Sequence, residues 1–195
     1  MSAPHTTLLK HCLPQPWKNG GGITHELLVW PPGEASAATP AAWALRVSVA
    51  DIDSDGPFSR FEGVDRRFAV LEGAGIELTI GGRRRQVRCG DPPIGFAGDV
   101  QTSCRLLDGR TRDLNLMVRK SAGSPILSSA YTGSGFGAGL AWRAVFAWSP
   151  AVVELDRSGH RIELAAGTFL WSDRGEPAWH LLEGRQAYWL GLRTP

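Results

Sequence analysis

Short segments in which apolar and polar residues alternate, separated by glycine turns, recur along this chain of 195 residues. From Phe68 to Phe96 the segments follow one another at even spacing, with Gly81-Gly82 and Gly90-Asp91 between them. Even spacing of short strands with turn signals is typical of β-sandwiches and β-barrels. The sequence therefore predicts an all-β fold.

The same plan returns 77 residues later in the chain: Gly82 falls on Gly159 and Gly90 falls on Gly167. The hydrophobic positions of the strands between these glycines coincide as well, and a closing strand follows in both copies. An internal repeat of this kind indicates two related β-barrel halves fused in one chain.

Composition excludes several classes of partner. The formal net charge is only +2, too small to indicate a nucleic-acid partner. Three cysteines, none at C-x-x-C spacing, fit a reducing compartment. The chain does not open with a charged segment followed by an apolar core, and no apolar run is long enough to cross a bilayer. We therefore expect a cytoplasmic protein without a membrane partner, and a homodimer is compatible with the sequence.

The sequence contains no complete metal, cofactor or nucleophile motif. Its five histidines lack the grouping of a β-barrel metal site, in which two His stand one residue apart and a Glu and a later His follow. The run Asp51–Gly56 with Glu62 fits a calcium-loop pattern, but a strand-like segment precedes it where an EF-hand has a helix. The G-x-S-x-G elbow, the dinucleotide fingerprint and the P-loop are all incomplete. We expect no metal and no cofactor.

The stretch from Pro16 to Leu27 brings an aromatic ring, a cation and a bare backbone to the start of a strand. Trp17 and Lys18 precede Asn19 and the three glycines of Gly20–Gly22. Small-molecule pockets are often built from such groups. A glycine-rich turn can equally do no more than reverse the chain.

Three predicted strands each carry a polar stripe opposite an apolar one. The polar stripes are Thr24 with Glu26, Arg46 with Ser48, and Asp113 with Asn115 and Met117. If the stripes point into a barrel, their charges need partners, because an unpaired buried ion is very costly. Arg46 would then pair with Glu26 or Asp113, or bind a ligand carboxylate. In the alternative arrangement the polar stripes face solvent and the apolar stripes form the core.

These segments resemble the signature of the HutD/Ves family. The matching motifs are P-W-K-N-G-G-G-x-T-x-E from Pro16 to Glu26, W-x-x-R-V-S-V-A from Trp43 to Ala50, D-G-P-F-S from Asp55 to Ser59, Asp65-Arg66, V-L-E-G from Val70 to Gly73, F-x-G-D from Phe96 to Asp99, and D-L-N-L-M from Asp113 to Met117. They occur in order over roughly the first 120 residues, whereas the second half resembles the family by length and pattern. One departure is Leu45, where the resemblance leads us to expect Trp.

The resemblance implies a bicupin-type double β-barrel, with two cupin-like halves that lack the usual metal ligands. The expected domains are an N-terminal cupin-like barrel with the family motifs at 1–120 and a C-terminal cupin-like half at 121–195, packed as one compact unit. The resemblance also implies an association with histidine degradation, where the family is thought to act as a regulator or metabolite binder. An enzymatic activity is not established for the family.

We therefore expect a binding protein for a small carboxylate metabolite, such as urocanate or an N-substituted glutamate, with a regulatory role in histidine utilisation. The expected ligand-binding residues are Trp17, Lys18, Asn19, Gly20, Gly21, Gly22, Thr24, Glu26, Arg46, Ser48, Phe58, Ser59, Arg66, Asp113, Asn115 and Met117. Arg46 or Lys18 would hold the carboxylate, and the glycine backbone would donate N–H groups.

Two other functions stay open. A metal-free cupin enzyme, an isomerase or hydrolase acting on a histidine-pathway intermediate, would use Glu26 or Asp113 as a general base. The missing catalytic motif makes this expectation the weaker one. A protein-interaction regulator would use the pocket only structurally and would expose a patch of Trp side chains.

Overall fold

The computed structural model describes residues 3–31, 43–156, 158–174 and 177–194. Within these ranges the chain forms β-strands and one short 3-10 helix, Leu9–His11, and every strand pairing is antiparallel. The all-β prediction is confirmed. No helix in this described part is long and apolar enough to cross a membrane.

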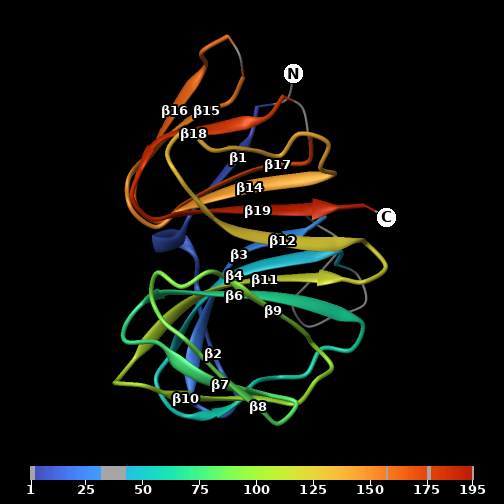
Figure 1. The fold of residues 1–195 in the computed structure, drawn as a ribbon, viewed down its shortest axis with the longest axis vertical. Coiled ribbons are helices and arrows are strands. Elements are labelled where there is room, and N and C mark those ends of the chain that lie inside the picture. The colour runs from blue at the N-terminus through green and yellow to red at the C-terminus, as the bar shows by residue number, and fades with distance from the viewer. Residues whose placement is uncertain (1–2, 32–42, 157, 175–176, 195) are drawn as a thin grey trace. The chain divides into compact units, whose positions relative to one another are not determined.

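The chain divides into two compact units, shown in Figure 1. The N-unit is Cys12–Ala122, and the C-unit is Met1–His11 together with Gly123–Pro195. The expected boundary at 120/121 lies close to the division at 122/123. The expectation for the first residues differs from the structure, because β1 (His5–Leu8) pairs with β17 (Thr168–Ser172) in the C-unit.

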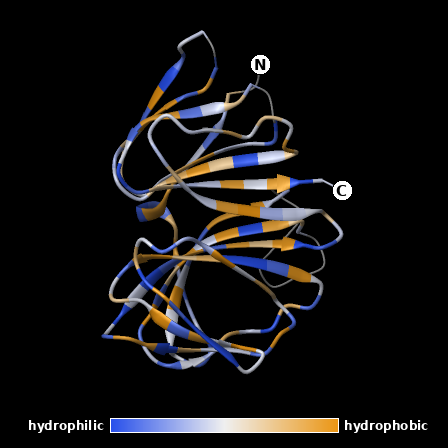
Figure 2. Ribbon diagram, viewed as in Figure 1, coloured by the Kyte–Doolittle hydropathy of each residue, from blue (hydrophilic) through white to orange (hydrophobic). Residues whose placement is uncertain are grey.

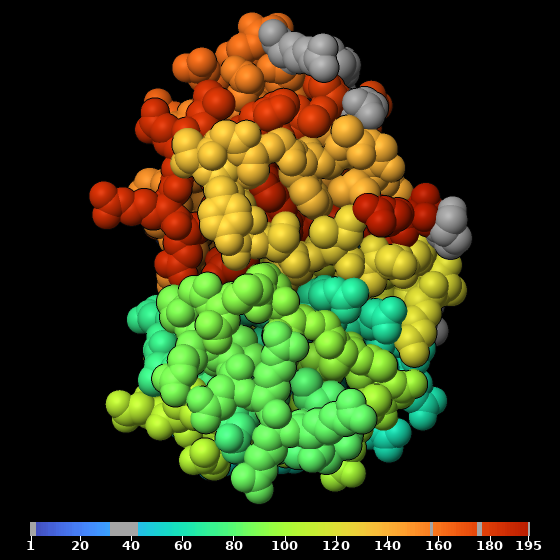
Figure 3. Space-filling view, in the orientation of Figure 1, coloured from blue at the N-terminus to red at the C-terminus, as the bar shows by residue number. Residues whose placement is uncertain are grey.

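The N-unit consists of two sheets, and Figure 1 shows their strands curving around a common centre. The order of the six-stranded sheet is β2 (Pro14–Pro16), β3 (Gly22–Trp30), β4 (Leu45–Ile52), β11 (Thr111–Arg119), β6 (Val64–Glu72) and β9 (Ile94–Ala97). The order of the four-stranded sheet is β5 (Gly56–Pro57), β10 (Thr102–Leu106), β7 (Ile76–Ile80) and β8 (Arg83–Val87). The β7–β8 hairpin forms part of the surface of this unit, coloured green in Figure 3.

The C-unit also consists of two sheets. The order of the first is β1, β17, β14 (Trp142–Ala147), β19 (Ala187–Arg193) and β12 (Ser124–Ala130). The order of the second is β13 (Gly135–Phe136), β18 (Trp179–Gly184), β15 (Ala151–Glu154) and β16 (Arg161–Leu164).

The two units share a strand order. The series β9-β6-β11-β4 of the N-unit corresponds to β17-β14-β19-β12 of the C-unit, and β5-β10-β7-β8 corresponds to β13-β18-β15-β16. The units differ at the sheet edges, where β3 and β2 extend the N-unit beside β4 and β1 extends the C-unit beside β17. The repeat read from the glycine spacing is therefore a repeat of topology.

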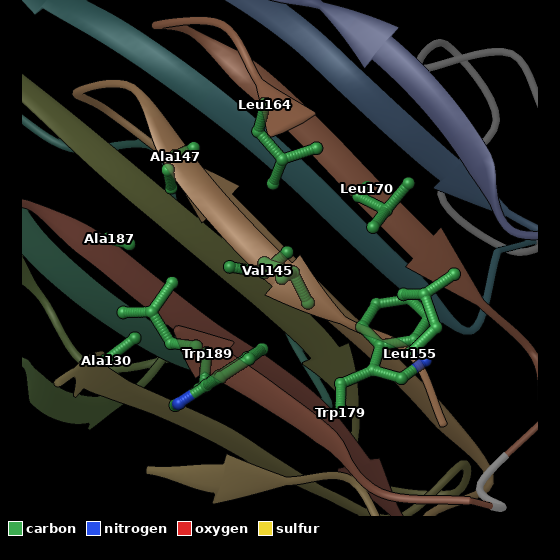
Figure 4. Packing of buried hydrophobic residues seen from close by; sticks show 12 residues of the cluster. Ala130, Val145, Ala147, Leu155, Leu164, Leu170, Trp179, Ala187 and Trp189 are labelled. Atoms are coloured by element: carbon green, nitrogen blue, oxygen red, sulfur yellow. The ribbon is translucent and has the colours of Figure 1, made fainter. Parts of the chain in front are cut away.

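The interior differs between the units. In the C-unit the buried cluster combines Trp179 and Trp189 with smaller apolar residues such as Val145 and Leu170 (Figure 4). In the N-unit the apolar cluster includes Phe68 from one sheet and Leu78 from the other. Its strands also carry hydrophilic residues between hydrophobic ones, visible as blue and orange alternation in Figure 2. Some of these hydrophilic residues line the candidate site.

Candidate ligand-binding site

The N-unit contains a cavity of about 520 Å³, which is within the range of small-molecule sites. Its lining residues come from β2, β3, β4, β5, β6 and β11 and from the turns next to them. They are Gln15, Pro16, Trp17, Lys18, Asn19, Thr24, Arg46, Ser48, Ala50, Pro57, Phe58, Ser59, Phe61, Arg66, Asp113, Asn115 and Met117.

The polar stripes reach the cavity because neighbouring strands are in register. Arg46 on β4 lies opposite Met117 on β11, and Ser48 lies opposite Asn115. Alternate residues of a strand share a face, so Asp113 follows Asn115 and Met117 on the same side. The polar stripes of β4 and β11 thus face inward together with Thr24 of β3, as in the first of the two arrangements expected from the sequence, whereas Glu26 does not line the cavity.

The mouth of the cavity is shaped by the glycine turn. Trp17 donates its indole N–H to the hydroxyl of Thr24 at 2.8 Å, which orients the ring beside β3. Trp17 also packs edge-on against Phe58, with ring centroids 6.2 Å apart. Lys18 and Asn19 continue the lining at an exposed position. The aromatic ring and the cation of the signature therefore both reach the cavity.

The three glycines have a different role from the expected one, since none of them lines the cavity. The N–H of Gly20 donates to the carbonyl of Trp17, and the N–H of Gly21 donates to the side chain of Asn19. These donors are used inside the turn and are not free for a ligand. Gly22 is required by close packing, because a Cβ there would collide with the carbonyl oxygen of Asp51.

Arg66 is the most unusual cation of the site. It is 7% exposed and lies over the rings of Phe58, Phe61 and Phe96, with its guanidinium carbon 5.0–5.9 Å from their centroids. Its Nη2 donates to Oδ1 of Asn115 at 3.0 Å, while its Nε has no hydrogen-bond partner. Burial lowers the pKa of Arg66 to about 10; the charge of Asp113 opposes this shift and that of Arg46 adds to it.

Asp113 is the most buried acid of the site. It is 1% exposed, and burial raises its pKa well above the usual range despite the nearby charge of Arg66. The amide of Asn115 donates to its Oδ1, and its Oδ2 has no hydrogen-bond partner. Neither Arg66 nor Asp113 takes part in an ion pair within 4.0 Å among the described residues.

Arg46 and Glu26 neutralise each other. Nε of Arg46 lies 2.7 Å from Oε2 of Glu26, and the side chains are 15% and 22% exposed. Arg46 lines the cavity, whereas Glu26 does not. The pairing that the sequence left open is therefore with Glu26, and the carboxylate proposed as a general base is held by a guanidinium.

The cavity lining also contains other expected residues and some that the sequence did not indicate. Thr24, Ser48, Phe58, Ser59 and Met117 all line the cavity. Sequence reasoning missed Gln15, Pro16, Ala50, Pro57 and Phe61. Pro16 and Pro57 lie inside the quoted motifs, and Ala50 continues the alternation of Arg46 and Ser48, so these three carried a signal. Gln15 and Phe61 did not.

The acidic run that resembles a calcium loop is occupied by basic side chains. Asp51 is held by Nε of Arg112 at 2.5 Å and by Nη2 of Arg110 at 2.6 Å. Burial alone would raise the pKa of Asp51, but the hydrogen bonds and charges of these two arginines lower it. No group of three or more His, Cys, Asp or Glu suited to a metal occurs in the ranges that the structure describes.

Comparison with known sequences gives a family match over most of the chain. The HutD family model matches residues 10–190. An uncharacterized 21.2 kDa protein in the hutC 3' region of Pseudomonas putida is 38% identical over 102 residues, 52% of this chain and 51% of the relative. Protein Ves of Cronobacter sakazakii is 34% identical over 105 residues, 53% of this chain and 54% of the relative. The chain spans about half the length of these curated relatives.

Comparison with solved structures agrees with the sequence match. HutD from Pseudomonas fluorescens SBW25 has a TM-score of 0.83 and 28% identity, with 99% of this chain and 100% of that chain covered. A cupin 2 conserved barrel domain protein from Leptotrichia buccalis, at a TM-score of 0.58 and 11% identity over 100% of this chain and 98% of its own, shows the fold alone. The fold is cupin-like, and the chain belongs to the HutD family.

Proposed function

We propose that the cavity of the N-unit binds a small carboxylate metabolite and that Arg66 is its anchor. The observation that carries this proposal is the buried guanidinium of Arg66, which has a free Nε and no carboxylate within 4.0 Å among the described residues. An unpaired buried charge is costly, so a chain that keeps one gains from an anion that enters. A guanidinium also matches a carboxylate with two parallel hydrogen bonds.

The anchor differs from the one expected from the sequence. Arg46 is already paired with Glu26, and Lys18 is exposed at the mouth. Arg66 lies deeper, between aromatic rings that exclude water and strengthen its attraction for an anion. The size of the cavity and its Trp17 and Phe58 walls support a ligand with a flat or apolar part next to its carboxylate.

Histidine utilisation supplies the candidate ligands. The Pseudomonas putida relative is named for a position in the hutC 3' region, which links the family to this locus. Urocanate carries a carboxylate on a flat unsaturated chain, and N-substituted glutamates carry carboxylates and an acyl or imino group. A regulatory role in histidine utilisation would follow if occupancy of the cavity reports the level of such an acid.

The site supports binding better than catalysis. The carboxylate of Glu26 is engaged by Arg46 at 2.7 Å and does not line the cavity, so it is not placed to act as a general base on a ligand there. The exposed patch of Trp required by an interaction module is also not supported: the large exposed apolar side chains of the described residues are Leu13 and Tyr131.

Isothermal titration calorimetry against urocanate, N-substituted glutamates and histidine tests the proposal. We expect heat of binding with one or more of the acids, loss of at least about tenfold in affinity in Arg66→Met, and no change in Arg143→Met. Arg143 is a matched control, because it is a buried arginine 77 residues further along the repeat, in the C-unit and outside the lining of the cavity. Equal binding by Arg66→Met and wild type would contradict the proposal.

A further inference from the structure

Two buried polar atoms that line the cavity lack a hydrogen-bond partner in the described part of the chain, Nε of Arg66 and Oδ2 of Asp113. Both residues are more than nine-tenths buried. Buried polar atoms are nearly always paired with protein or water. The two atoms are therefore positions that a ligand can satisfy.

Asn115 determines which oxygen of Asp113 is available. Its Oδ1 accepts a hydrogen bond from Nη2 of Arg66 at 3.0 Å, so its Nδ2 is the atom that faces Asp113. That Nδ2 donates to Oδ1 of Asp113. Oδ1 of Asp113 therefore accepts a hydrogen bond whether Asp113 is ionised or neutral. Oδ2 of Asp113 is the oxygen that carries the proton in the neutral form and that can contact a ligand.

The charges of the cavity decide between an ionised and a neutral Asp113. Arg46 is neutralised by Glu26, so Arg66 supplies the unpaired positive charge among the buried lining residues. An ionised Asp113 would cancel that charge and repel an entering anion. A protonated Asp113 leaves one net positive charge and adds an O–H donor, which together suit a carboxylate.

Burial is the main cause that favours the neutral form of Asp113. Arg66 on β6 and the hydrogen bond from Asn115 lower its pKa, the negative charge of Asp51 on β4 raises it, and the effect of burial is the largest. The thiol of Cys104 on β10 interacts with Asp113 and stays uncharged, because burial raises its pKa to about 11. No histidine lines the cavity, as far as the structure describes it.

We propose that Asp113 binds the ligand as a neutral carboxylic acid, with Oδ2–H donating to the ligand while Arg66 holds the ligand's anionic oxygen. The inference rests on the proposed function and names its substrate class. The ligand is a monoanionic acid that places an acceptor, either the second carboxylate oxygen or a carbonyl, beside the oxygen on Arg66. A dianion is disfavoured, because the cavity offers one unpaired buried positive charge, so of the two candidate classes urocanate fits better than a glutamate with two ionised carboxylates. At a pH at which Asp113 is ionised in the ligand-free protein, ligand binding is accompanied by the uptake of one proton from solvent.

Nuclear magnetic resonance of the whole 195-residue chain with labelled aspartate tests the inference, with formate as the probe. The side-chain carbon of Asp113, assigned by its loss in Asp113→Asn, is expected to report a protonated carboxyl at about pH 7 and a titration that moves to higher pH when formate binds. Above the midpoint of the free protein, formate affinity falls by up to about tenfold per pH unit.

Two variants complete the test. Asp113→Asn keeps a side chain of the same shape with an N–H donor, and its formate affinity is expected to stay within about threefold of wild type without the pH dependence. Glu72→Gln, at an exposed acid outside the cavity, keeps the pH dependence. A carboxyl ionised at neutral pH, or a titration that formate moves to lower pH, overturns the inference. If formate does not bind at all, the proposed function fails for this probe, and the titration of the free protein still decides the state of Asp113.

Discussion

Arg66 and Arg143 stand at equivalent places in the internal repeat and are both buried, but their surroundings differ. Arg143 donates to the carbonyl oxygen of Pro177 and lies over the ring of Trp179, 4.5 Å from its centroid. Arg66 instead lines the cavity of the N-unit, where its Nη2 donates to Oδ1 of Asn115. The same residue type therefore contacts a loop in the C-unit and, under the proposed function, binds an anion in the N-unit.

Stability measurements can separate these two roles. Arg66→Met removes a desolvated charge that has no ion-pair partner, which offsets the loss of its hydrogen bond to Asn115 and of its ring contacts, so we expect its free energy of unfolding to lie within about 1 kcal/mol of wild type or above it. Arg143→Met removes a hydrogen bond and a ring contact, with an expected loss of about 1–3 kcal/mol. Urea unfolding monitored by tryptophan fluorescence measures both. A larger loss in Arg66→Met than in Arg143→Met would show that Arg66 is kept for stability.

Asp51 and Asp113 should give opposite pH dependences of stability. The folded-state pKa of Asp51 is lowered, so its contribution is present above the unfolded pKa of about 4 and is lost as pH falls through the folded value. The folded-state pKa of Asp113 is raised. Above about pH 4 the unfolded chain loses the proton of Asp113 while the folded protein keeps it, so folding then requires the uptake of a proton. The folded state is therefore destabilised by Asp113 as the pH rises.

Asparagine variants at both positions, unfolded at about pH 4 and about pH 8, test these signs. Asp51→Asn is expected to cost about 1–2 kcal/mol at the higher pH and less at the lower, since Arg110 is half exposed and screened. Asp113→Asn is expected to be more stable than wild type at the higher pH and equal to it at the lower. Parallel pH dependences in the two variants would contradict this assignment.

At the scale of elements, the turn before β3 owes its shape to glycines of two kinds. Gly20 has a φ of 71°, a conformation that favours glycine, and open space where a Cβ would point. Gly22 has no such φ, but a Cβ there would collide with the carbonyl of Asp51 and lie 3.2 Å from the ring of Trp17. The first glycine is needed for its conformation and the second for its size.

Alanine substitutions distinguish these two requirements. Gly20→Ala is expected to cost about 1–2 kcal/mol of unfolding free energy and to leave ligand affinity nearly unchanged. Gly22→Ala is expected to cost about 1–3 kcal/mol and to weaken binding as well, because the Trp17 ring at the mouth must move. Thermal unfolding together with calorimetry provides both values. Intact binding in Gly22→Ala would show that the ring is not part of the site.

The strands of the site were predictable from the sequence, but the direction of their side chains was not. The alternation from Trp43 to Ala50 gives β4, and that from Asp113 to Arg119 gives β11. A period of two defines two faces without saying which is inside, because both faces of these strands contain apolar residues. The inward face is determined by the pairing of β4 and β11 with each other and with β3 and β6. This pairing places the side chains of Arg46 and Asn115 on the face that lines the cavity.

The proposed anchor, Arg66, was equally hard to single out from the sequence. Arg66 appeared there as half of an Asp-Arg pair, whereas Arg46 stood in an alternating stripe. The two arginines differ in whether an acid is close to them. Glu26 on β3 is paired with Ser48 on β4, which brings its carboxylate within reach of Arg46. No acid lies within 4.0 Å of Arg66 in the described chain. Such distances depend on strand register, which a single sequence does not specify.

At the scale of the whole molecule, the repeat was visible in the turn glycines, but the course of the N-terminus was not. β1 is short, two of its four residues are exposed, and His5 stacks on Trp171, with centroids 4.3 Å apart. Nothing in its own composition says that it pairs with a strand more than 160 residues away. The C-unit therefore gains its edge strand from a segment that the sequence assigned to the other half.

Removal of residues 1–11 tests this arrangement. We expect the C-unit to lose at least about 2 kcal/mol of stability, because four paired residues of β1 and the cover over Trp171 disappear and the edge of β17 is exposed. The cavity is lined by residues of the N-unit, so carboxylate affinity should stay within about twofold. Hydrogen exchange resolved by residue measures the first effect and calorimetry the second. Unchanged exchange protection in β17 would contradict the pairing.

A crystal structure of the complex with the acid that binds most tightly tests the central claim most directly. The account predicts density for one acid molecule inside the N-unit, with a carboxylate oxygen at hydrogen-bond distance from Nε of Arg66 and an acceptor atom at Oδ2 of Asp113. An acid bound elsewhere on the protein, with the Arg66 guanidinium untouched, would contradict it.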